Sequence, residues 1–218
     1  MFVLSSDFDV PPFNLPNLDD NNSFADYVEA AEAEILKKLL GKTIYDQFVA
    51  GLTAAGSAWS STTTYALNAV VYVGNNVYTS VQAANTNHAV TDAAWWTLTT
   101  EDDKWLLLKN GDDYVWSDVD YEWVGMVKLL KPYIFAMWLK DTYDSLSGIG
   151  VSVPEAENGS VISPARRIAA AYNKFSELSG AQYCTENTLY GYLVANEVTY
   201  PDAATDFTPV GFMNAWNI

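Results

Sequence analysis

The sequence predicts a mainly α-helical bundle that carries a β-hairpin and a small inserted β-module, so that the protein is α+β overall. Apolar residues recur at helical spacing in several long segments, residues 56–100 are almost free of charge, and two aromatic-rich segments flank a short polar turn. These observations divide the chain into a helical domain, made of residues 1–55 and 101–218 with extended arms at both ends, and an inserted β domain at 56–100.

The composition sets the class of protein. The chain has 218 residues, half of them hydrophobic, which is enough to bury a core in one domain plus a small module. A net charge of −16 argues against a nucleic-acid-binding surface, because such a surface needs clustered lysine and arginine. We see no apolar run that would span a membrane and no signal peptide at the first residues. One cysteine and one histidine argue against a His/Cys-ligated metal site, and we expect no cofactor.

The first 22 residues are predicted to form an extended arm rather than a helix. Three prolines and the polar run Leu18–Asn22 interrupt any helical pattern there. We expect such an arm to be loose in a monomer, and to lie on a neighbouring copy if the protein forms a ring.

Two helices follow the arm, and each opens with the spacing of a capping box. Ser23 with Asp26 begins the first, whose apolar residues lie on one face, and Gly41 ends it. Thr43 with Asp46 begins the second, which stops before the charge-poor stretch.

That stretch, residues 56–100, contains a single charged residue, Asp92, and is rich in Thr, Val, Tyr, Asn and Trp. Val70–Val73, Gly74–Asn76 and Val77–Tyr78 have the pattern of strand, turn and strand. We therefore expect a self-contained β-module, inserted at a loop between two helices, where insertions are tolerated.

A β-hairpin is predicted next, from Tyr114–Trp116 and Tyr121–Trp123 with a polar turn between them. It leads into Val124–Gly150, whose apolar rows leave only a thin polar strip. A helix that is apolar on most sides is normally buried, so we expect this segment to be the central helix of the bundle. Proline at position 132 is compatible with a start near Lys131 or with a kink at Pro132.

Beyond the central helix we expect four further segments. A loop at 151–162 precedes a helix that starts at Ser163–Pro164, because proline is favoured at the first helical position, and that ends at Gly180. A shorter helix around Glu186–Asn196 and a second extended arm over 199–218 complete the chain.

No residue is assigned a catalytic role. Acidic groups at Glu101–Asp103, Asp112–Asp113 and Asp118–Asp120 lie in loops and hairpin turns, where carboxylates are usually solvated, whereas an acid/base pair must converge in a cleft. We expect His88 to be a surface loop residue and Cys184 to be a partly buried thiol. The chain is therefore not expected to be an enzyme, and an unrecognised acidic active site is the weakest alternative.

The inserted module has six large aromatic residues: Trp59, Tyr65, Tyr72, Tyr78, Trp95 and Trp96. They cannot all be fully buried in so short a module, and exposed aromatic rings stack on sugars or anchor protein interfaces. A miniature aromatic core is the competing interpretation, and we favour it for Tyr65, Tyr78 and one of the two adjacent tryptophans. The candidates for an exposed glycan-binding platform are Tyr72, Trp95 and Trp96.

Three segments resemble the head–tail connector (neck adaptor) proteins of tailed bacteriophages. They are FADYVEAAEAEILKKLLGKTIYDQF at 24–48, the stretch from WLLLKNGDDYVW to YEWVGMVKLLKPYIFAMWLKDTY at 105–143, and GVSVPEAENG with SPARRIAAAYNKF at 150–175. The resemblance implies a structural virion protein, made in the cytoplasm of the bacterial host, that forms a ring, typically twelve-fold, at the neck between portal and tail. Its partners would be copies of itself, the portal, and tail or other neck proteins.

In such a ring the DNA would pass through without specific binding. A charge of −16 per subunit, repeated around the ring, would repel the phosphate backbone wherever it faces the lumen. The candidate lumen acids lie in the hairpin and its approach: Asp112, Asp113, Asp118, Asp120 and Glu122. The alternative is that these acids face the solvent outside the ring and only keep the protein soluble.

The inserted module resembles the chitin-binding type of small carbohydrate-binding module. The residues that match its pattern W…Y-x2-G-x2-V…G-x2-Y…P…W-x-L are Trp59, Tyr65, Val71, Tyr78 and Trp96–Leu98. Asn68 stands where the pattern has glycine, and Val90 stands near the proline position. This resemblance implies the alternative function, a glycan- or host-surface-binding protein that acts through the insert.

Overall fold

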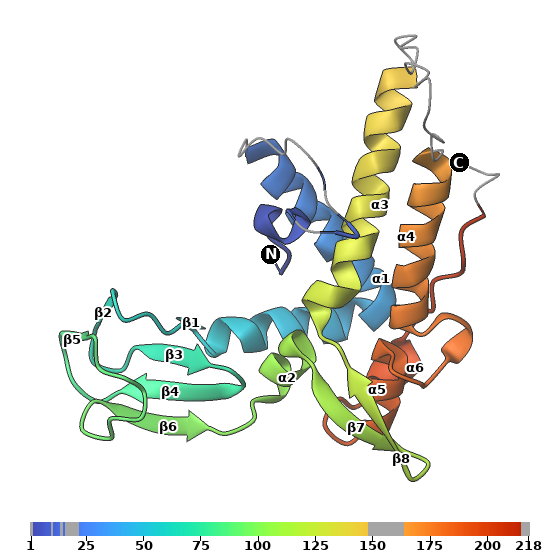
Figure 1. Ribbon diagram of the computed structural model, residues 1–218. Coiled ribbons are helices and arrows are strands. Elements are labelled where there is room, and N and C mark those ends of the chain that lie inside the picture. Colours follow the sequence, from blue (N-terminus) through green and yellow to red (C-terminus); the bar gives the residue numbers. More distant parts are fainter. Residues whose placement is uncertain (1, 10, 14, 16–21, 148–163, 215–218) are drawn as a thin grey trace.

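Three units project from a shared helical core in the computed structural model: a β-module, a β-hairpin and a pair of helices (Figure 1). The structure describes residues 2–9, 11–13, 15, 22–147 and 164–214. Its helices are η1 (Ser5–Phe8), α1 (Asn22–Ala54), α2 (Lys104–Asn110), α3 (Met126–Ser147), α4 (Pro164–Ser179), η2 (Ala181–Tyr183), α5 (Leu189–Ala195) and α6 (Ala203–Asp206). Its strands are β1 (Ser57–Ala58), β2 (Thr64–Tyr65), β3 (Val70–Val73), β4 (Asn76–Ser80), β5 (Asn85–Thr86), β6 (Trp96–Thr100), β7 (Asp112–Trp116) and β8 (Val119–Trp123).

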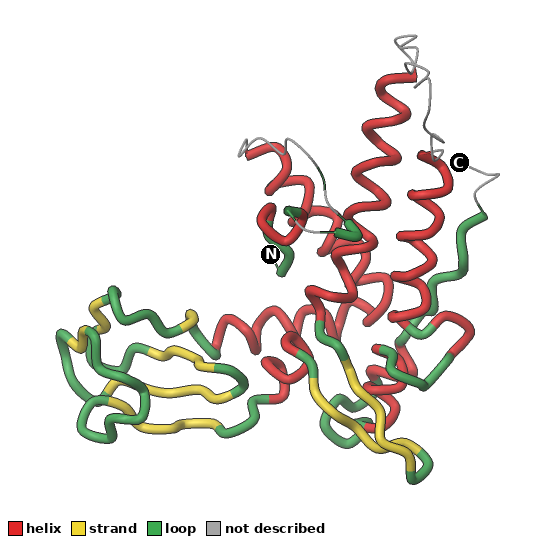
Figure 2. Tube along the Cα trace, in the orientation of Figure 1, coloured by secondary structure: helices red, strands yellow, loops and turns green. Residues whose placement is uncertain are grey.

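The prediction of a mainly α fold is wrong. About 49% of the structure is helical and 17% is strand, arranged in several small sheets, which is an α+β mixture. Figure 2 shows the strands confined to the insert and the hairpin. The strand content exceeds the expectation because the insert forms six short strands and because the hairpin turn is tight, which lengthens both of its strands.

The N-terminal arm lies against its own helical core, so the expectation of a loose arm is wrong for the described part. Val3 and Phe8 are fully buried, and the ring of Phe2 stacks on that of Phe48 at a centroid distance of 5.3 Å. The buried carboxylate of Glu32 accepts hydrogen bonds from the backbone amides of Phe2 and Val3 at 2.7–3.0 Å. These contacts join residues far apart in sequence, and they hold the arm on α1.

Helix α1 has the break that the sequence predicts. Gly41 has φ +73° and ψ 158°, outside the helical region, so Asn22–Ala54 consists of two helical segments that meet there. The first segment starts one residue before the predicted position, and the second ends before Gly56 as expected.

Helix α3 begins at Met126, so Pro132 lies inside it and the predicted alternative of a start near Lys131 is wrong. Its first half is the buried centre of the fold, with Ile134 and Ala136 fully inaccessible. From Met137 to Lys140 the helix is only half-buried, where it projects beside α4 (Figure 1). The prediction of a buried central helix is therefore confirmed for its first half alone.

The elements after α3 follow the expected order. Helix α4 begins at Pro164 and is followed by Gly180, and α5 begins after Thr188, whose hydroxyl accepts from the amide of Gly191 at 3.0 Å. The predicted loop at 151–162 and the cap at Ser163 lie outside the described residues. The C-terminal arm contains the short helix α6, and its Phe207 is buried against the core.

The insert forms a four-stranded sheet of order β1-β3-β4-β6 and a separate β2–β5 pair. The predicted strand–turn–strand unit is confirmed at β3 and β4, which pair antiparallel. Its core holds Tyr65, Val71 and Trp96. A second small cluster, Ala55, Val77 and Leu106, joins the module to the helices.

The described helices include none with a segment long and apolar enough to cross a lipid bilayer.

Candidate functional site

The β7–β8 hairpin has a two-residue turn that fixes its register. Ser117 and Asp118 both have positive φ, +52° and +64°, which suits the right-handed twist of a tight hairpin. Trp116 pairs with Val119 at the tip, and every residue from there to the base is paired. Because side chains alternate along a strand, the register divides the hairpin into two faces.

The inner face holds the hairpin on the helical core. The hydroxyl of Tyr114 accepts from the amide of Thr188 at 3.2 Å and donates to the carbonyl of Thr185. The indole nitrogen of Trp123 donates to the carbonyl of Leu108 at 2.8 Å. Both rings are buried, so the position of the hairpin is set by packing and by satisfied hydrogen bonds.

The outer face is acidic and exposed. Asp113 lies directly opposite Glu122, and Val115, which is 60% exposed, lies opposite Asp120. Among the described residues no lysine or arginine forms an ion pair with these three carboxylates. Like charges directly opposite one another destabilise a strand pair, so this face lowers the stability of the hairpin.

The five predicted lumen acids therefore fall into three environments. Asp113, Asp120 and Glu122 share the outer face, and Asp118 is exposed in the turn. Asp112 is half-buried on the inner face, 3.5 Å from the hydroxyl of Tyr192, and burial raises the pKa of its carboxyl. The sequence pattern does not distinguish Asp112 from its neighbour, but the alternation of the strand places it on the other side.

The three residues of the predicted glycan platform do not come together. Trp96 is only 2% exposed and its indole nitrogen donates to the carbonyl of His88 at 2.9 Å, so it belongs to the core of the module and cannot form an exposed platform. Tyr72 faces the helices instead, where its hydroxyl accepts from Lys109 at 3.0 Å. Trp95 is half-buried, with His88 stacked on its ring at 3.7 Å.

The competing interpretation, a miniature aromatic core, is confirmed. Tyr65 packs edge-on against Trp96 at a centroid distance of 5.2 Å, and Tyr78 packs against the same cluster. The adjacent tryptophans divide as expected, with Trp96 inside and Trp95 nearer the surface. Cys184 is exposed, so the prediction of a partly buried thiol is wrong.

A groove lined by lysines was not predicted. The groove has a volume of about 400 Å³ and an apolar floor. The floor combines residues of the N-terminal arm, of the segment that leads into α3, and of α3 and α4: Pro12, Phe13, Val124, Pro132 and Leu178. Lys128, Lys131 and Lys174 surround it. The first two stand one helical turn apart in the sequence, which is a local signal, but only the fold brings Lys174 and Phe13 to them.

The described residues contain no group of three or more His, Cys, Asp and Glu side chains arranged to hold a metal ion. Comparison of the chain with models of protein families, with curated proteins and with solved structures found no match.

Proposed function

We propose that the chain is a structural subunit of the head–tail connector in a tailed bacteriophage, where copies form a ring between the portal and the tail. The support comes from the three sequence segments that resemble neck adaptors and from the acidic outer face of the hairpin. In this proposal the protein acts through its surfaces, and its partners are further copies, the portal, and tail or other neck proteins.

The structural observation that supports this function most directly is the pair of like charges at Asp113 and Glu122. A carboxylate directly opposite another costs stability, and a lysine at either position would turn repulsion into attraction. Together with Asp120 the pair makes a face that repels phosphate. Such a face suits the wall of a channel through which DNA slides, because a basic wall would bind the duplex through counterion release and hold it.

Electron microscopy of the purified full chain tests the assembly. We expect rings with a central opening, whose copy number, twelve by resemblance, is counted in end-on class averages. A chain that stays monomeric over a wide concentration range would contradict the proposal.

A second experiment tests the lumen assignment. Particles that carry Asp113→Lys with Glu122→Lys should package DNA but eject it more slowly, and added salt should relieve the defect because it screens the new attraction. Particles with Glu34→Lys and Glu101→Lys change the total charge equally at exposed positions elsewhere and serve as the control. Equal ejection rates in the two variants would place the hairpin acids outside the lumen.

The alternative function, glycan or host-surface binding through the insert, has less support. Of its three candidate residues one is buried in the module core and one faces the helices. Trp95 is half-buried, and one face of its ring is covered by His88.

A further inference from the structure

The lysine-lined groove is unusual in this acidic chain because positive charges surround it. Three of the eleven lysine and arginine residues of a chain with net charge −16 surround one apolar hollow. Lys128 and Lys131 are in no ion pair with a described residue, whereas Lys174 contacts the exposed carboxylate of Glu177 at 3.3 Å. Lys128 also lines a neighbouring hollow with Asp112, Asp113 and Glu122 of its own chain. A partner that complements the groove would supply an apolar anchor and a carboxylate next to it.

The tip of the β7–β8 hairpin has that chemistry. Trp116 and Val119 pair across the tip on one face. The ring of Trp116 is half-buried and packs partly against the main core, and Val119 is 48% exposed. Asp118, in the turn beside Val119, is exposed and is in no ion pair with a described residue. The tip thus combines an aromatic ring, an aliphatic side chain and a carboxylate.

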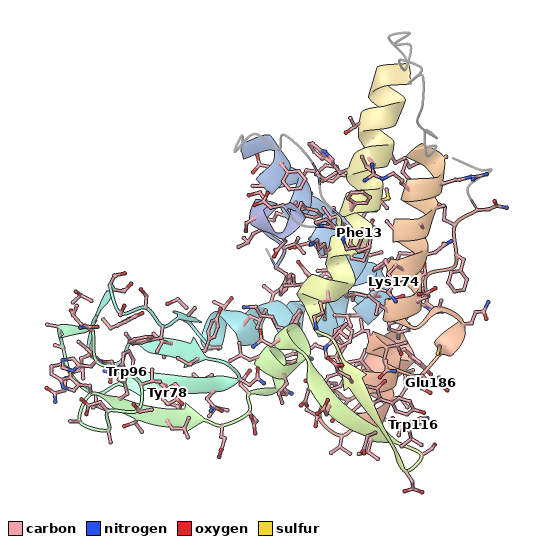
Figure 3. The ribbon with its side chains drawn as sticks, in the orientation of Figure 1. Phe13, Tyr78, Trp96, Trp116, Lys174 and Glu186 are labelled. Atoms are coloured by element: carbon pink, nitrogen blue, oxygen red, sulfur yellow. The ribbon has the colours of Figure 1, made fainter. Side chains whose placement is uncertain are left out.

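A single molecule does not bring the tip and the groove together. Figure 3 shows Phe13 and Lys174 beside the projecting helices and Trp116 far out on the hairpin. The inner face of the hairpin is anchored to the helical core by Tyr114 and Trp123, so the tip cannot swing round to the groove. The complementary surface is available on another copy.

We propose that the hairpin tip of one copy docks into the lysine-lined groove of the next. Val119 and the exposed part of the Trp116 ring would cover the apolar floor, and Asp118 would pair with Lys128 or Lys131. Because the two surfaces are different, the contact is head-to-tail, and such contacts generate a ring if the rotation between copies closes. This inference rests on the proposed ring and names its subunit interface, and it leaves the outer-face acids free for the lumen.

Sedimentation velocity of the full chain over a concentration series tests the interface with two variants. The groove variant carries Lys128→Glu and Lys131→Glu, and the tip variant carries Asp118→Asn and Val119→Lys, because asparagine removes the charge and tolerates the positive φ of that turn position. All the changed side chains are exposed or half-buried, so circular dichroism melting should match that of the wild type. Each variant alone should lose self-association, with an apparent dissociation constant raised about tenfold or more.

The matched control is Lys37→Glu with Lys38→Glu. It reverses two lysines on α1, one of which lies over the ring of Tyr45 at 5.0 Å, as Lys131 lies over that of Phe8 at 5.9 Å. This control should assemble like the wild type, because it changes the net charge equally without touching the groove. Loss of assembly in the control would show that total charge decides association, and would overturn the inference.

Mixing the two variants gives the sharpest result. The groove variant keeps an intact tip and the tip variant keeps an intact groove, so an equimolar mixture should form dimers through one native interface and should stop there. An interface formed by the same patch on both copies would not recover in this way. A mixture that remains monomeric overturns the inference.

The outcomes also separate this inference from the proposed function. If the wild type forms rings and the groove variant forms them equally well, the docking is wrong and the ring stands. If the wild type forms open filaments that both variants abolish, the docking is right and the closed ring is wrong. A wild type that never associates overturns both.

Discussion

The inserted β-module and the β7–β8 hairpin are both small antiparallel units rich in aromatic residues, yet they relate to the helical core in opposite ways. In the module the indole nitrogen of Trp96 donates to the carbonyl of His88, which belongs to the same module. In the hairpin the polar atoms of Trp123 and Tyr114 bond to Leu108, Thr185 and Thr188, all of which lie outside the hairpin. The most deeply buried aromatic ring of the module is therefore satisfied within the module, whereas the buried rings of the hairpin depend on the helices.

The largest effect is expected for Trp123→Ala. The ring is 1% exposed in the main core, so its removal leaves a cavity and an unpaired carbonyl, at a cost of about 3–5 kcal/mol. Since stabilities are roughly 5–15 kcal/mol in total, thermal melting of the helical signal should shift strongly downwards. Trp116→Ala, at the half-exposed tip of the same hairpin, is the control and should shift the melting much less. Equal shifts would show that the hairpin is not anchored at its base.

Trp96→Ala should be equally damaging to the module but should leave the helices folded. The ring is 2% exposed and packs on Tyr65 within the module. Its removal should therefore lower the stability of the module by about 3–5 kcal/mol. We expect the module to melt in a separate early transition, seen by tryptophan fluorescence, while the helical circular dichroism persists. Trp95→Ala, half-buried, is the control.

A single transition in which the helical signal and the module are lost together would contradict the idea that the module is autonomous and the hairpin is not. The junction formed by Ala55, Val77 and Leu106 would then be strong enough to couple the two units. Replacement of residues 56–100 by a short Gly/Ser linker tests the same independence by removing the module. The helical remainder should still melt cooperatively.

Tyr114→Phe should have a smaller effect on the hairpin. It removes only a hydroxyl, and leaves the amide of Thr188 and the carbonyl of Thr185 without that partner in a buried place, at a cost of about 1–3 kcal/mol. Tyr121→Phe is a close control, because Tyr121 pairs with Tyr114 across the strands and its hydroxyl makes no hydrogen bond within the described chain. Chemical denaturation should separate the two variants, and equal midpoints would mean that the Tyr114 contact contributes nothing.

Local signals in the sequence predict much of this fold. Gly41 breaks α1, Pro164 starts α4 and the aromatic segments pair as a hairpin, because each depends on residues close together in the chain. The density of aromatic residues in the module predicts that one of the two adjacent tryptophans, Trp95 or Trp96, lies in its core. It does not predict which of them is inside, because that depends on how Tyr65 packs across the module.

Features that depend on distant residues could not be predicted. The N-terminal arm is fixed by the carboxylate of Glu32 and the ring of Phe48, and neither is marked as a binding position by its own neighbours. The lysine-lined groove likewise needs Phe13 and Lys174 to meet at α3. The sequence predicts that the second half of α3 is buried as well, but the side chains from Met137 to Lys140 are only half-buried.

The smallest change in stability is expected on the acidic outer face of the hairpin. Its direction is informative, because the substitution should stabilise the protein. Glu122→Lys would replace the repulsion across the strand pair with an attraction to Asp113, and should raise the stability by about 0.2–1 kcal/mol. Glu101→Lys, exposed and outside the strands, changes the net charge equally and is the control. The difference between their denaturation midpoints should shrink at high salt, because exposed charges are screened. A larger gain in stability for Glu122→Lys than for Glu101→Lys at low salt would show that the native hairpin retains a destabilising pair, as expected if the acidic face serves DNA passage. Equal gains in stability would mean that only the total charge of the molecule matters.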